Sequence, residues 1–292
     1  MANLKEIRIR ISSVHSTKQI TSAMKLVSAA KLRRAQDIIL QMRPYANKLQ
    51  EMLNNLFTGS DIPEDNLYTR QREINKVLIV LITSNRGLCG AFNANVIKQA
   101  VDLRNTKYQG LIKQNRVDFM TIGKKASDIL KYKKIPVAYE KHSLLEKLDY
   151  NDIVNTADFL INEYIDNKYD RIELVYNQFK NAAVQILTVE TFLPVTIKPA
   201  AGKGFKQDYI FEPEKETIVT ELIPKTLKIK FYRALLDSNA AEHGARMTAM
   251  HKATDNAIEL LRELRLTYNK ARQSSITNEL LEIVSGAEAL KK

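Results

Sequence analysis

The chain has 292 residues, 45% of them hydrophobic, which is enough for one sizeable core plus further elements. Its single cysteine, Cys89, excludes an internal disulfide and fits a reducing compartment. The longest fully apolar run, 77–82, is far shorter than the roughly 20 residues that cross a bilayer, so any membrane association is expected to come through partners. The first residues are charged and include Glu6, which argues against a signal or transit peptide and favours a bacterial protein.

The positive charge is concentrated at the two ends of the chain. The whole chain carries 45 Lys and Arg against 33 Asp and Glu, a net charge of +12. Residues 1–58 hold 10 basic and 3 acidic side chains, and residues 225–292 hold 12 and 8, so about +11 belongs to these segments. Such segments expect an acidic partner, which could be nucleic acid, an anionic membrane or an acidic protein surface.

Residues 3–58 predict one long helix, because Asn3 and Glu6 have the spacing of a capping box and a heptad frame of apolar residues follows. In the middle this frame meets only polar residues: Lys18, Thr21, Lys25 and Ser28. The apolar stripe there lies instead at Ile20, Met24, Val27 and Ala30. This shift predicts a local change of coiled-coil register. Pro44 is expected to kink the helix without ending it, and the helix is expected to stop at 59–63.

Residues 59–224 alternate predicted strands and helices. Strands are predicted at 77–83, 117–122, 135–139, 172–176 and 184–192. Helices are predicted at 94–103, from the second strand to about 132, and at 149–166. The run 77–83 is apolar and β-branched, as in a strand that is buried on both faces. This order predicts a mostly parallel sheet with helices on both faces, a Rossmann-like arrangement.

Residues 225–292 predict a second long helix that begins near Pro224, a favourable first-turn residue. After Gln273 its apolar frame shifts to Ile276, Leu280, Ile283, Ala287 and Leu290. Because the intervening domain returns the chain to one end, the two helices are expected to run antiparallel. The predicted fold class is therefore α/β, with a long antiparallel coiled coil of N- and C-terminal helices and a central Rossmann-like domain. The expected divisions are 1–58, 59–224 and 225–292.

The turn 84–93 follows a strand and precedes a helix, a place where α/β folds often bind phosphates. It has neither the phosphate-loop spacing nor the dinucleotide fingerprint. We interpret it as a tight turn whose glycines allow close backbone packing, and we expect the chain itself to bind no nucleotide.

No other constellation predicts an active site. His243 and His251 are two helical turns apart but have no nearby acidic or cysteine companion, so no metal site is expected. Cys89 is interpreted as a small buried hydrophobe. One basic cluster is either a solvated helix face or a docking site for acidic loops, and the uneven charge favours docking: Lys25, Lys31, Arg33 and Arg34.

Three blocks in the terminal helices resemble the gamma subunit of F-type ATP synthases. They are 18–36 (KQITSAMKLVSAAKLRRAQ), 246–250 with 253–257 (RMTAM and ATDNA), and 276–287 (ITNELLEIVSGA). The turn 84–93 also fits, whereas 100–170 is less distinctive. The chain departs from the family pattern at Asn85 and at His251-Lys252, which leaves the contacts of residue 251 open.

The resemblance implies a central stalk whose paired helices lie inside a ring of three alpha and three beta subunits, while the α/β domain meets epsilon and the ring of c subunits. ATP, ADP and Mg would be bound by alpha and beta, with no cofactor in this chain. The implied location is the cytoplasmic face of a bacterial inner membrane, as a peripheral part of the synthase.

The resemblance also implies roles for individual residues. Arg272 and Gln273 would hydrogen-bond a catch loop on a beta subunit. The segment tied to coupling contains Thr277, Glu279 and Glu282. Met24 would lie where the helix pair meets the acidic lever of beta, and Arg246, which lies on the facing helix, would brace that region. Tyr209 and Glu212 would belong to the foot that faces epsilon and the c ring.

Two alternatives remain open at this point. The +11 at the ends also fits a nucleic-acid-binding protein with a basic antiparallel coiled-coil arm, although little aromatic interleaving supports base stacking. A dinucleotide-binding enzyme fits the alternating middle but lacks the fingerprint.

Overall fold

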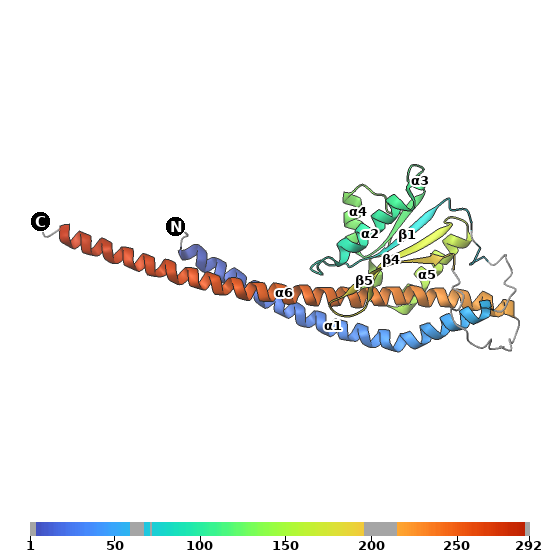
Figure 1. Cartoon of the computed structure of the whole chain (residues 1–292), viewed down its shortest axis with the longest axis horizontal. Coiled ribbons are helices and arrows are strands. Elements are labelled where there is room, and N and C mark those ends of the chain that lie inside the picture. The colour runs from blue at the N-terminus through green and yellow to red at the C-terminus, as the bar shows by residue number, and fades with distance from the viewer. Residues whose placement is uncertain (1–3, 59–66, 71, 196–214, 290–292) are drawn as a thin grey trace. The chain divides into compact units, whose positions relative to one another are not determined.

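A computed structural model describes residues 4–58, 67–70, 72–195 and 215–289 (Figure 1). They fall into two compact units, one within 1–28 and 247–292 and the other within 29–246. Helices α1 (Leu4–Thr58) and α6 (Lys215–Ala289) each contribute residues to both units. The compact units therefore take in parts of both terminal helices, and their bounds differ from the helix and linker divisions expected from sequence.

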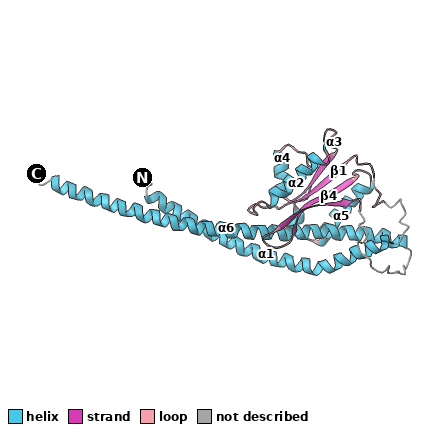
Figure 2. Ribbon diagram, in the orientation of Figure 1, coloured by secondary structure: helices cyan, strands magenta, loops and turns pink. Residues whose placement is uncertain are grey.

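The unit within 29–246 is built on a five-stranded sheet in the order β3-β2-β1-β4-β5 (Figure 2). Its strands are β1 (Val77–Ile82), β2 (Val117–Ile122), β3 (Tyr139–Glu140), β4 (Arg171–Phe179) and β5 (Gln185–Leu193). The first four are parallel, and β5 pairs antiparallel with β4. The predicted mostly parallel sheet is thus confirmed.

Helices cover both faces of this sheet, because the side chains of the central strand alternate between two cores. Val77, Ile79 and Leu81 pack with α2 (Phe92–Thr106) and α4 (Lys124–Tyr132). Leu78, Val80 and Ile82 pack on the other side with α5 (Tyr150–Ile165) and with α6. All six residues of β1 are buried, which explains why the strand reads as an unbroken apolar run. The short α3 (Gln109–Ile112) and the 3₁₀ turn η1 (Ser143–Leu145) lie in the connections.

Two element predictions are wrong. The third strand covers only Tyr139–Glu140 rather than 135–139. Pro136 has no N–H to donate to a sheet, and Ile135 and Val137 pack against the α2/α4 core without pairing in the sheet.

The last helix begins at Lys215 rather than near Pro224, which lies inside it. An internal proline removes one helical hydrogen bond. Ile223, Leu227 and Phe231 recur at every fourth position and are buried against the sheet, and this packing offsets that loss. Helix α6 therefore has 75 residues, against 55 in α1. As predicted, α1 continues through Pro44.

Candidate functional site

In the unit formed by the chain ends, three side-chain contacts define how α1 and α6 pair. Arg8 Nη2 donates to the Tyr268 hydroxyl at 2.9 Å. The Thr254 hydroxyl donates to the Thr21 hydroxyl at 2.8 Å, and Lys25 Nζ lies 3.3 Å from His251 Nδ1. As the position on α1 rises from 8 to 25, its partner on α6 falls from 268 to 251. The helices therefore pair antiparallel, as predicted.

The predicted register change near Ile20–Ala30 is wrong. Thr21 and Ser28 are buried, being 8% and 3% exposed, whereas Ile20 and Val27 are 60% and 57% exposed. The original heptad frame thus continues through its polar stretch. Burial of these hydroxyls costs little, because Ser28 Oγ donates to the Met24 carbonyl at 2.8 Å and Thr21 Oγ1 to the Lys18 carbonyl at 3.1 Å.

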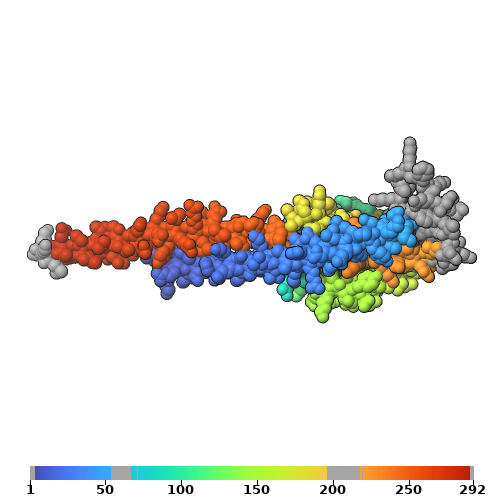
Figure 3. Space-filling view, turned by 90° about the horizontal axis from the view of Figure 1, so that it is seen from below, coloured from blue at the N-terminus to red at the C-terminus, as the bar shows by residue number. Residues whose placement is uncertain are grey.

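The last part of α6 extends beyond this pairing. Continuing the same register places residue 4, the first described residue of α1, opposite residue 272. The red end of α6 accordingly has no neighbouring helix among the described residues (Figure 3). This segment, residues 273–289, still exposes large apolar side chains: Ile276, Leu280, Leu281, Ile283 and Val284.

The five C-terminal residues expected to contact partners all lie at this end of α6 and are exposed: Arg272, Gln273, Thr277, Glu279 and Glu282. Their described contacts stay within the helix: Thr277 Oγ1 donates to the Gln273 carbonyl at 2.9 Å, and Ser275 Oγ donates to Glu279 at 3.4 Å. Met24 is half-buried on α1. Tyr209 and Glu212 lie outside the described residues.

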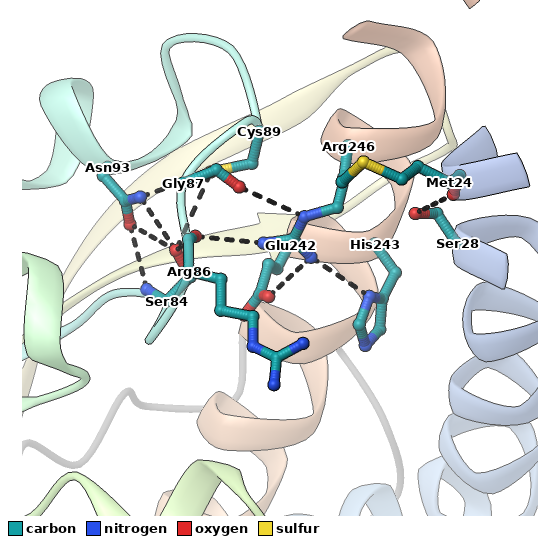
Figure 4. Close-up of polar contacts among 10 residues, drawn as sticks. All are labelled: Met24, Ser28, Ser84, Arg86, Gly87, Cys89, Asn93, Glu242, His243 and Arg246. Atoms are coloured by element: carbon teal, nitrogen blue, oxygen red, sulfur yellow. Dashed lines mark hydrogen bonds and ion pairs between the residues drawn. The ribbon is translucent and has the colours of Figure 1, made fainter. Parts of the chain in front are cut away.

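Arg246, in the unit within 29–246, ties α6 to the turn between β1 and α2 (Figure 4). Its Nη2 donates to the Arg86 carbonyl at 3.1 Å, and its Nε donates to the Gly87 carbonyl at 3.3 Å. Its Nη1 forms an ion pair with Glu242 Oε1 at 2.7 Å and lies 3.4 Å from His243 Nδ1. The guanidinium thus connects two backbone carbonyls to a carboxylate while only 8% of the residue is exposed.

Burial determines the charge states around Arg246. It raises the pKa of Glu242, against the opposing effect of the Arg246 charge. Burial lowers the pKa of His243 to about 4, and the charges of Arg246 and Lys31 act in the same direction. His243 is therefore neutral at pH 7. The sequence pattern placed Arg246 on the helix, but its contact with a turn some 160 residues earlier carried no local signal.

A second set of hydrogen bonds holds the turn itself (Figure 4). The amide N–H of Ser84 donates to Asn93 Oδ1 at 2.9 Å, and Asn93 Nδ2 donates to the Ser84 hydroxyl at 2.8 Å. The Ser84 hydroxyl in turn donates to the Arg86 carbonyl at 2.6 Å. Cys89 is buried, as predicted, and accepts from Asn93 Nδ2 at 3.2 Å.

The sequence predicted that the glycines of the turn 84–93 allow close backbone packing. This prediction is wrong, because no other backbone lies close to these glycines. A Cβ added at Gly87 or Gly90 would meet nothing within 4 Å, although Gly90 has a positive φ of 60°. The close approach is at Gly123, where an added Cβ would lie against the Thr83 carbonyl oxygen.

The first amides of α4 are already occupied at this edge of the sheet. The N–H groups of residues 124, 125 and 126 donate to Asn85 Oδ1, the Ser84 carbonyl and Thr83 Oγ1 at 3.0, 3.1 and 3.1 Å. Helix N-termini bind phosphates through such amides when they are free. These three amides serve packing instead.

Within the described residues, no helix is long and apolar enough to cross a membrane. The same residues contain no group of three or more His, Cys, Asp or Glu side chains that could hold a metal ion. The expectation that His243 and His251 lack acidic neighbours is wrong, because Glu242 precedes His243 and Asp255 Oδ2 lies 3.4 Å from His251 Nδ1.

Comparison with known proteins gives one consistent relationship along the chain. Residues 3–290 match the family described as ATP synthase. The ATP synthase gamma chain of Flavobacterium psychrophilum is 57% identical over 291 residues, covering 100% of both chains. That of Cytophaga hutchinsonii is 51% identical over 293 residues, covering 99% of each.

Solved structures share the fold. A chain of the Euglena gracilis mitochondrial ATP synthase rotor, in rotational state 1, superposes with a TM-score of 0.66 at 21% identity. The match covers 94% of this chain and 98% of that one. A chain of the same enzyme in rotational state 3, in a structure of OSCP, F1 and the c-ring, superposes with a TM-score of 0.67 at 22% identity, covering 98% and 94%. The long helices and the mixed sheet thus form a known architecture.

Proposed function

Because the chain belongs to the ATP synthase gamma-chain family, we propose that it is the central stalk of an F-type ATP synthase. In this role it couples proton flow through the membrane sector to ATP synthesis or hydrolysis in the catalytic ring by rotation. The observation that carries the proposal is the end of α6 beyond Arg272, which exposes an apolar surface without a partner helix among the described residues. Contiguous exposed apolar side chains mark interaction sites.

The physical case for a surrounding partner is that isolated helices are marginal in water. Most helical stability comes from packing an apolar face against something else. Residues 273–289 of α6 have that face, but α1 does not reach it. We propose that this segment turns in an apolar bearing formed by the catalytic ring of alpha and beta subunits.

An asymmetric axle explains how a non-catalytic chain can control catalysis. A ring with threefold symmetry has equivalent sites until something asymmetric occupies its centre. A single helix pair contacts each catalytic subunit differently and thereby biases the conformational equilibrium of each site differently. As the axle turns, each site passes through binding, synthesis and release.

The residue roles proposed for this function follow the family resemblance and fit the exposure of these residues. Arg272 and Gln273 are exposed and carry the donors that a catch loop on a beta subunit would need. Thr277, Glu279 and Glu282 follow on the same free segment of α6 as the coupling region.

Three further roles are proposed outside the C-terminal segment of α6. Met24 of α1 would lie where the helix pair meets an acidic lever on beta. Arg246 braces α6 against the turn between β1 and α2, a role supported by its three carbonyl and carboxylate contacts. Tyr209 and Glu212 are proposed for the foot that faces epsilon and the c ring.

The matched solved chains come from an ATP synthase rotor and from a structure of OSCP, F1 and the c-ring, which supports a place in the same kind of complex. We propose alpha, beta, epsilon and c as the partner subunits, with ATP, ADP and Mg bound by alpha and beta. The proposed location is the cytoplasmic face of a bacterial inner membrane, reached only through these partners. The matches give no support to the nucleic-acid-binding alternative.

Reconstitution tests the proposal directly. The full chain is mixed with alpha and beta subunits from the same source, and complex formation and ATPase activity are measured with and without it. We expect a stable complex and a gain in ATPase activity, with none from the chain alone. No complex and no gain would overturn the stalk assignment, and tight, salt-sensitive binding to RNA would instead favour the basic arm.

A further inference from the structure

Two loops at one edge of the sheet gather basic side chains without any acidic residue. Segment 107–116 leads into β2, and segment 129–138 forms the end of α4 and leads into β3. Because these strands are parallel, the loops that precede them lie at the same edge of the sheet, the amino edge. Together the two segments contain no Asp or Glu and six cations: Lys107, Lys113, Arg116, Lys131, Lys133 and Lys134.

Packing brings the two loops side by side. The amide N–H of Ala138 donates to the Phe119 carbonyl of β2 at 2.8 Å, so the loop into β3 runs along β2. Ile112 and Ile135, one from each segment, both pack on the hydrophobic cluster that contains Val117, the first residue of β2. The two loops therefore form one surface at the amino edge.

Four of the six cations form no ion pair with a described residue, whereas the other two are paired with carboxylates of β3 and β4. The same surface carries an aromatic side chain, Tyr132, which is 89% exposed. The basic amino edge is defined by the following exposed residues: Lys113, Arg116, Tyr132, Lys133 and Lys134.

This surface suits a polyanion that also offers an apolar layer. Unpaired like charges that are held together raise the local positive potential. A tyrosine ring has an apolar body and a polar tip, which fits the boundary between a membrane and water. Single-stranded nucleic acid is held by stacking successive bases on aromatic side chains, and the basic amino edge has one such side chain. A membrane that contains anionic phospholipid supplies both the charge and the apolar layer.

The order of contacts along α6 shows which edge of the sheet is farther from the proposed bearing. Lys230 Nζ donates to the Thr191 carbonyl at 2.7 Å, and Thr191 pairs with Glu173 near the amino end of β4. Arg246, which comes later in α6, contacts the turn that follows β1, at the carboxyl edge. The segment proposed for the bearing begins only at residue 273. Along the helix, the amino edge is therefore the edge farther from the catalytic ring, as a membrane contact requires.

We propose that the basic amino edge binds the headgroups of anionic phospholipids at the membrane surface. The proposal rests on the proposed function, because the partner subunits bring the chain to the membrane and these loops add a direct contact there. Clusters of Lys and Arg beside a membrane are attracted to anionic lipid, and the attraction falls off within a Debye length.

Vesicle binding tests the proposal in the complex of the full chain with alpha and beta subunits. The complex is used because the ring would cover the basic terminal helices, which could otherwise bind lipid themselves. Co-sedimentation is measured with vesicles of phosphatidylglycerol and phosphatidylcholine in equal parts, and with vesicles of phosphatidylcholine alone. We expect binding to the anionic vesicles only, weakening as the salt concentration rises.

Two matched triple variants locate the binding surface. The test variant removes three charges of the basic amino edge: Lys113→Gln, Lys133→Gln and Lys134→Gln. The control removes three charges from exposed residues that follow β2, β3 and β4 at the carboxyl edge: Lys124→Gln, Lys141→Gln and Lys180→Gln. We expect the affinity for anionic vesicles to fall roughly tenfold or more in the test variant and less than about threefold in the control. Thermal unfolding checks that both variants fold.

The outcomes separate this proposal from the stalk function. If the wild-type chain forms no complex with alpha and beta, the stalk function itself fails. If the complex forms but binds neither kind of vesicle, binds both equally, or is affected alike by the two triple variants, only the lipid proposal is overturned. Binding to RNA without binding to the anionic vesicles would also overturn it.

A fluorescent reporter tests the contact at one position. The chain contains no tryptophan, so Tyr132→Trp adds a single indole at the basic amino edge. With the anionic vesicles we expect its emission to shift to shorter wavelength, whereas Tyr150→Trp, at the exposed start of α5, should not shift. An unshifted emission for Tyr132→Trp would contradict the proposal.

A photo-crosslinker at position 132 of the whole synthase identifies the occupant. In membranes that contain phosphatidylglycerol, we expect it to label lipid. Labelling of a c or epsilon peptide without lipid would assign the surface to a protein partner and overturn the proposal.

Discussion

Gly244 of α6 lies against the backbone of Ala182, at the tip of the hairpin between β4 and β5. A Cβ added to Gly244 would be 3.2 Å from the Ala182 carbonyl oxygen and 3.3 Å from its Cα. Glycine in a helix interior costs roughly 1 kcal/mol relative to alanine, so its presence here needs a reason. Close approach of the hairpin backbone to the helix supplies that reason.

Gly244→Ala should therefore destabilise the protein even though alanine favours helices, because overpacking against backbone atoms costs about 1–3 kcal/mol. Gly286→Ala is the matched control in the same helix, since an added Cβ there meets nothing within 4 Å. Thermal unfolding of the two variants should show a lower midpoint for the first and an unchanged or higher one for the second. A higher midpoint for Gly244→Ala would contradict this prediction, because it would show that the backbone at Ala182 moves away at little cost.

Arg246→Ala should be among the most destabilising substitutions in the chain. It leaves the Glu242 carboxylate and the carbonyls of Arg86 and Gly87 without this donor in a buried place. Breaking a buried ion pair from one side costs about 3–5 kcal/mol. Chemical denaturation measures this loss, with exposed Arg33→Ala as the control, for which the change should stay within about 0.5 kcal/mol.

A companion variant distinguishes the lost contacts from general damage. Glu242→Gln combined with Arg246→Met removes both charges and keeps much of the side-chain volume. It should recover part of the stability lost in Arg246→Ala, because no charge is then left buried alone. No recovery would mean that the bonds to the two carbonyls, rather than the ion pair, carry the effect.

His243 predicts a defined loss of stability in mild acid. Its pKa in the folded chain is about 4, below the usual 6.5, so the unfolded chain binds more protons between these values. Stability is therefore full above pH 6.5 and is lost as pH falls towards 4. His243→Gln should lose less stability between pH 7 and pH 5 than wild type does, measured by denaturant unfolding.

The control for this pH prediction is the same substitution at exposed His15. Glu242, whose pKa is raised, contributes a slope of the opposite sign in every variant and cancels in the comparison. Equal pH slopes for wild type and His243→Gln would contradict the buried neutral imidazole.

Arg272→Ala with Gln273→Ala should weaken coupling without unfolding the chain. Both side chains are exposed and make no contact that holds the α/β unit, so the unfolding free energy should change by less than about 0.5 kcal/mol. Hydrogen bonds to a charged group are worth about 1.5–3 kcal/mol each, so proton-driven ATP synthesis should fall roughly tenfold or more. Lys270→Ala with Ser274→Ala is the control, and unchanged synthesis in the Arg272 and Gln273 variant would count against the catch role.

The sequence correctly predicted the parts of this fold that depend on local periodicity. β2 occupies the predicted 117–122, because a short, mostly apolar run bounded by polar residues and Gly123 allows few other placements of a strand. α1 ends at Thr58, just before the predicted break. The start of α6 was missed because Pro224 is a strong local signal that packing of Ile223 and Leu227 overrides.

The residues of the candidate site were likewise predicted only in part. The resemblance placed Arg272, Gln273 and the following segment on the last helix, where they lie exposed. The buried seam at Thr21 and Ser28 was mispredicted, because hydropathy does not register a hydroxyl that bonds back to its own helix. The contacts of Arg246 with Arg86 and Gly87 join residues about 160 positions apart, and no window of sequence contains both.

By itself, then, the sequence determined two long basic helices, an α/β middle with a strand buried on both faces, and membership of a family. Those properties follow from which side chains avoid water and how often they recur along the chain. The tertiary structure decided the pairing register, and with it the point on α6, opposite Leu4 of α1, beyond which α6 extends without α1. Such pairings depend on shape and charge between distant segments, which become neighbours only when the chain has folded.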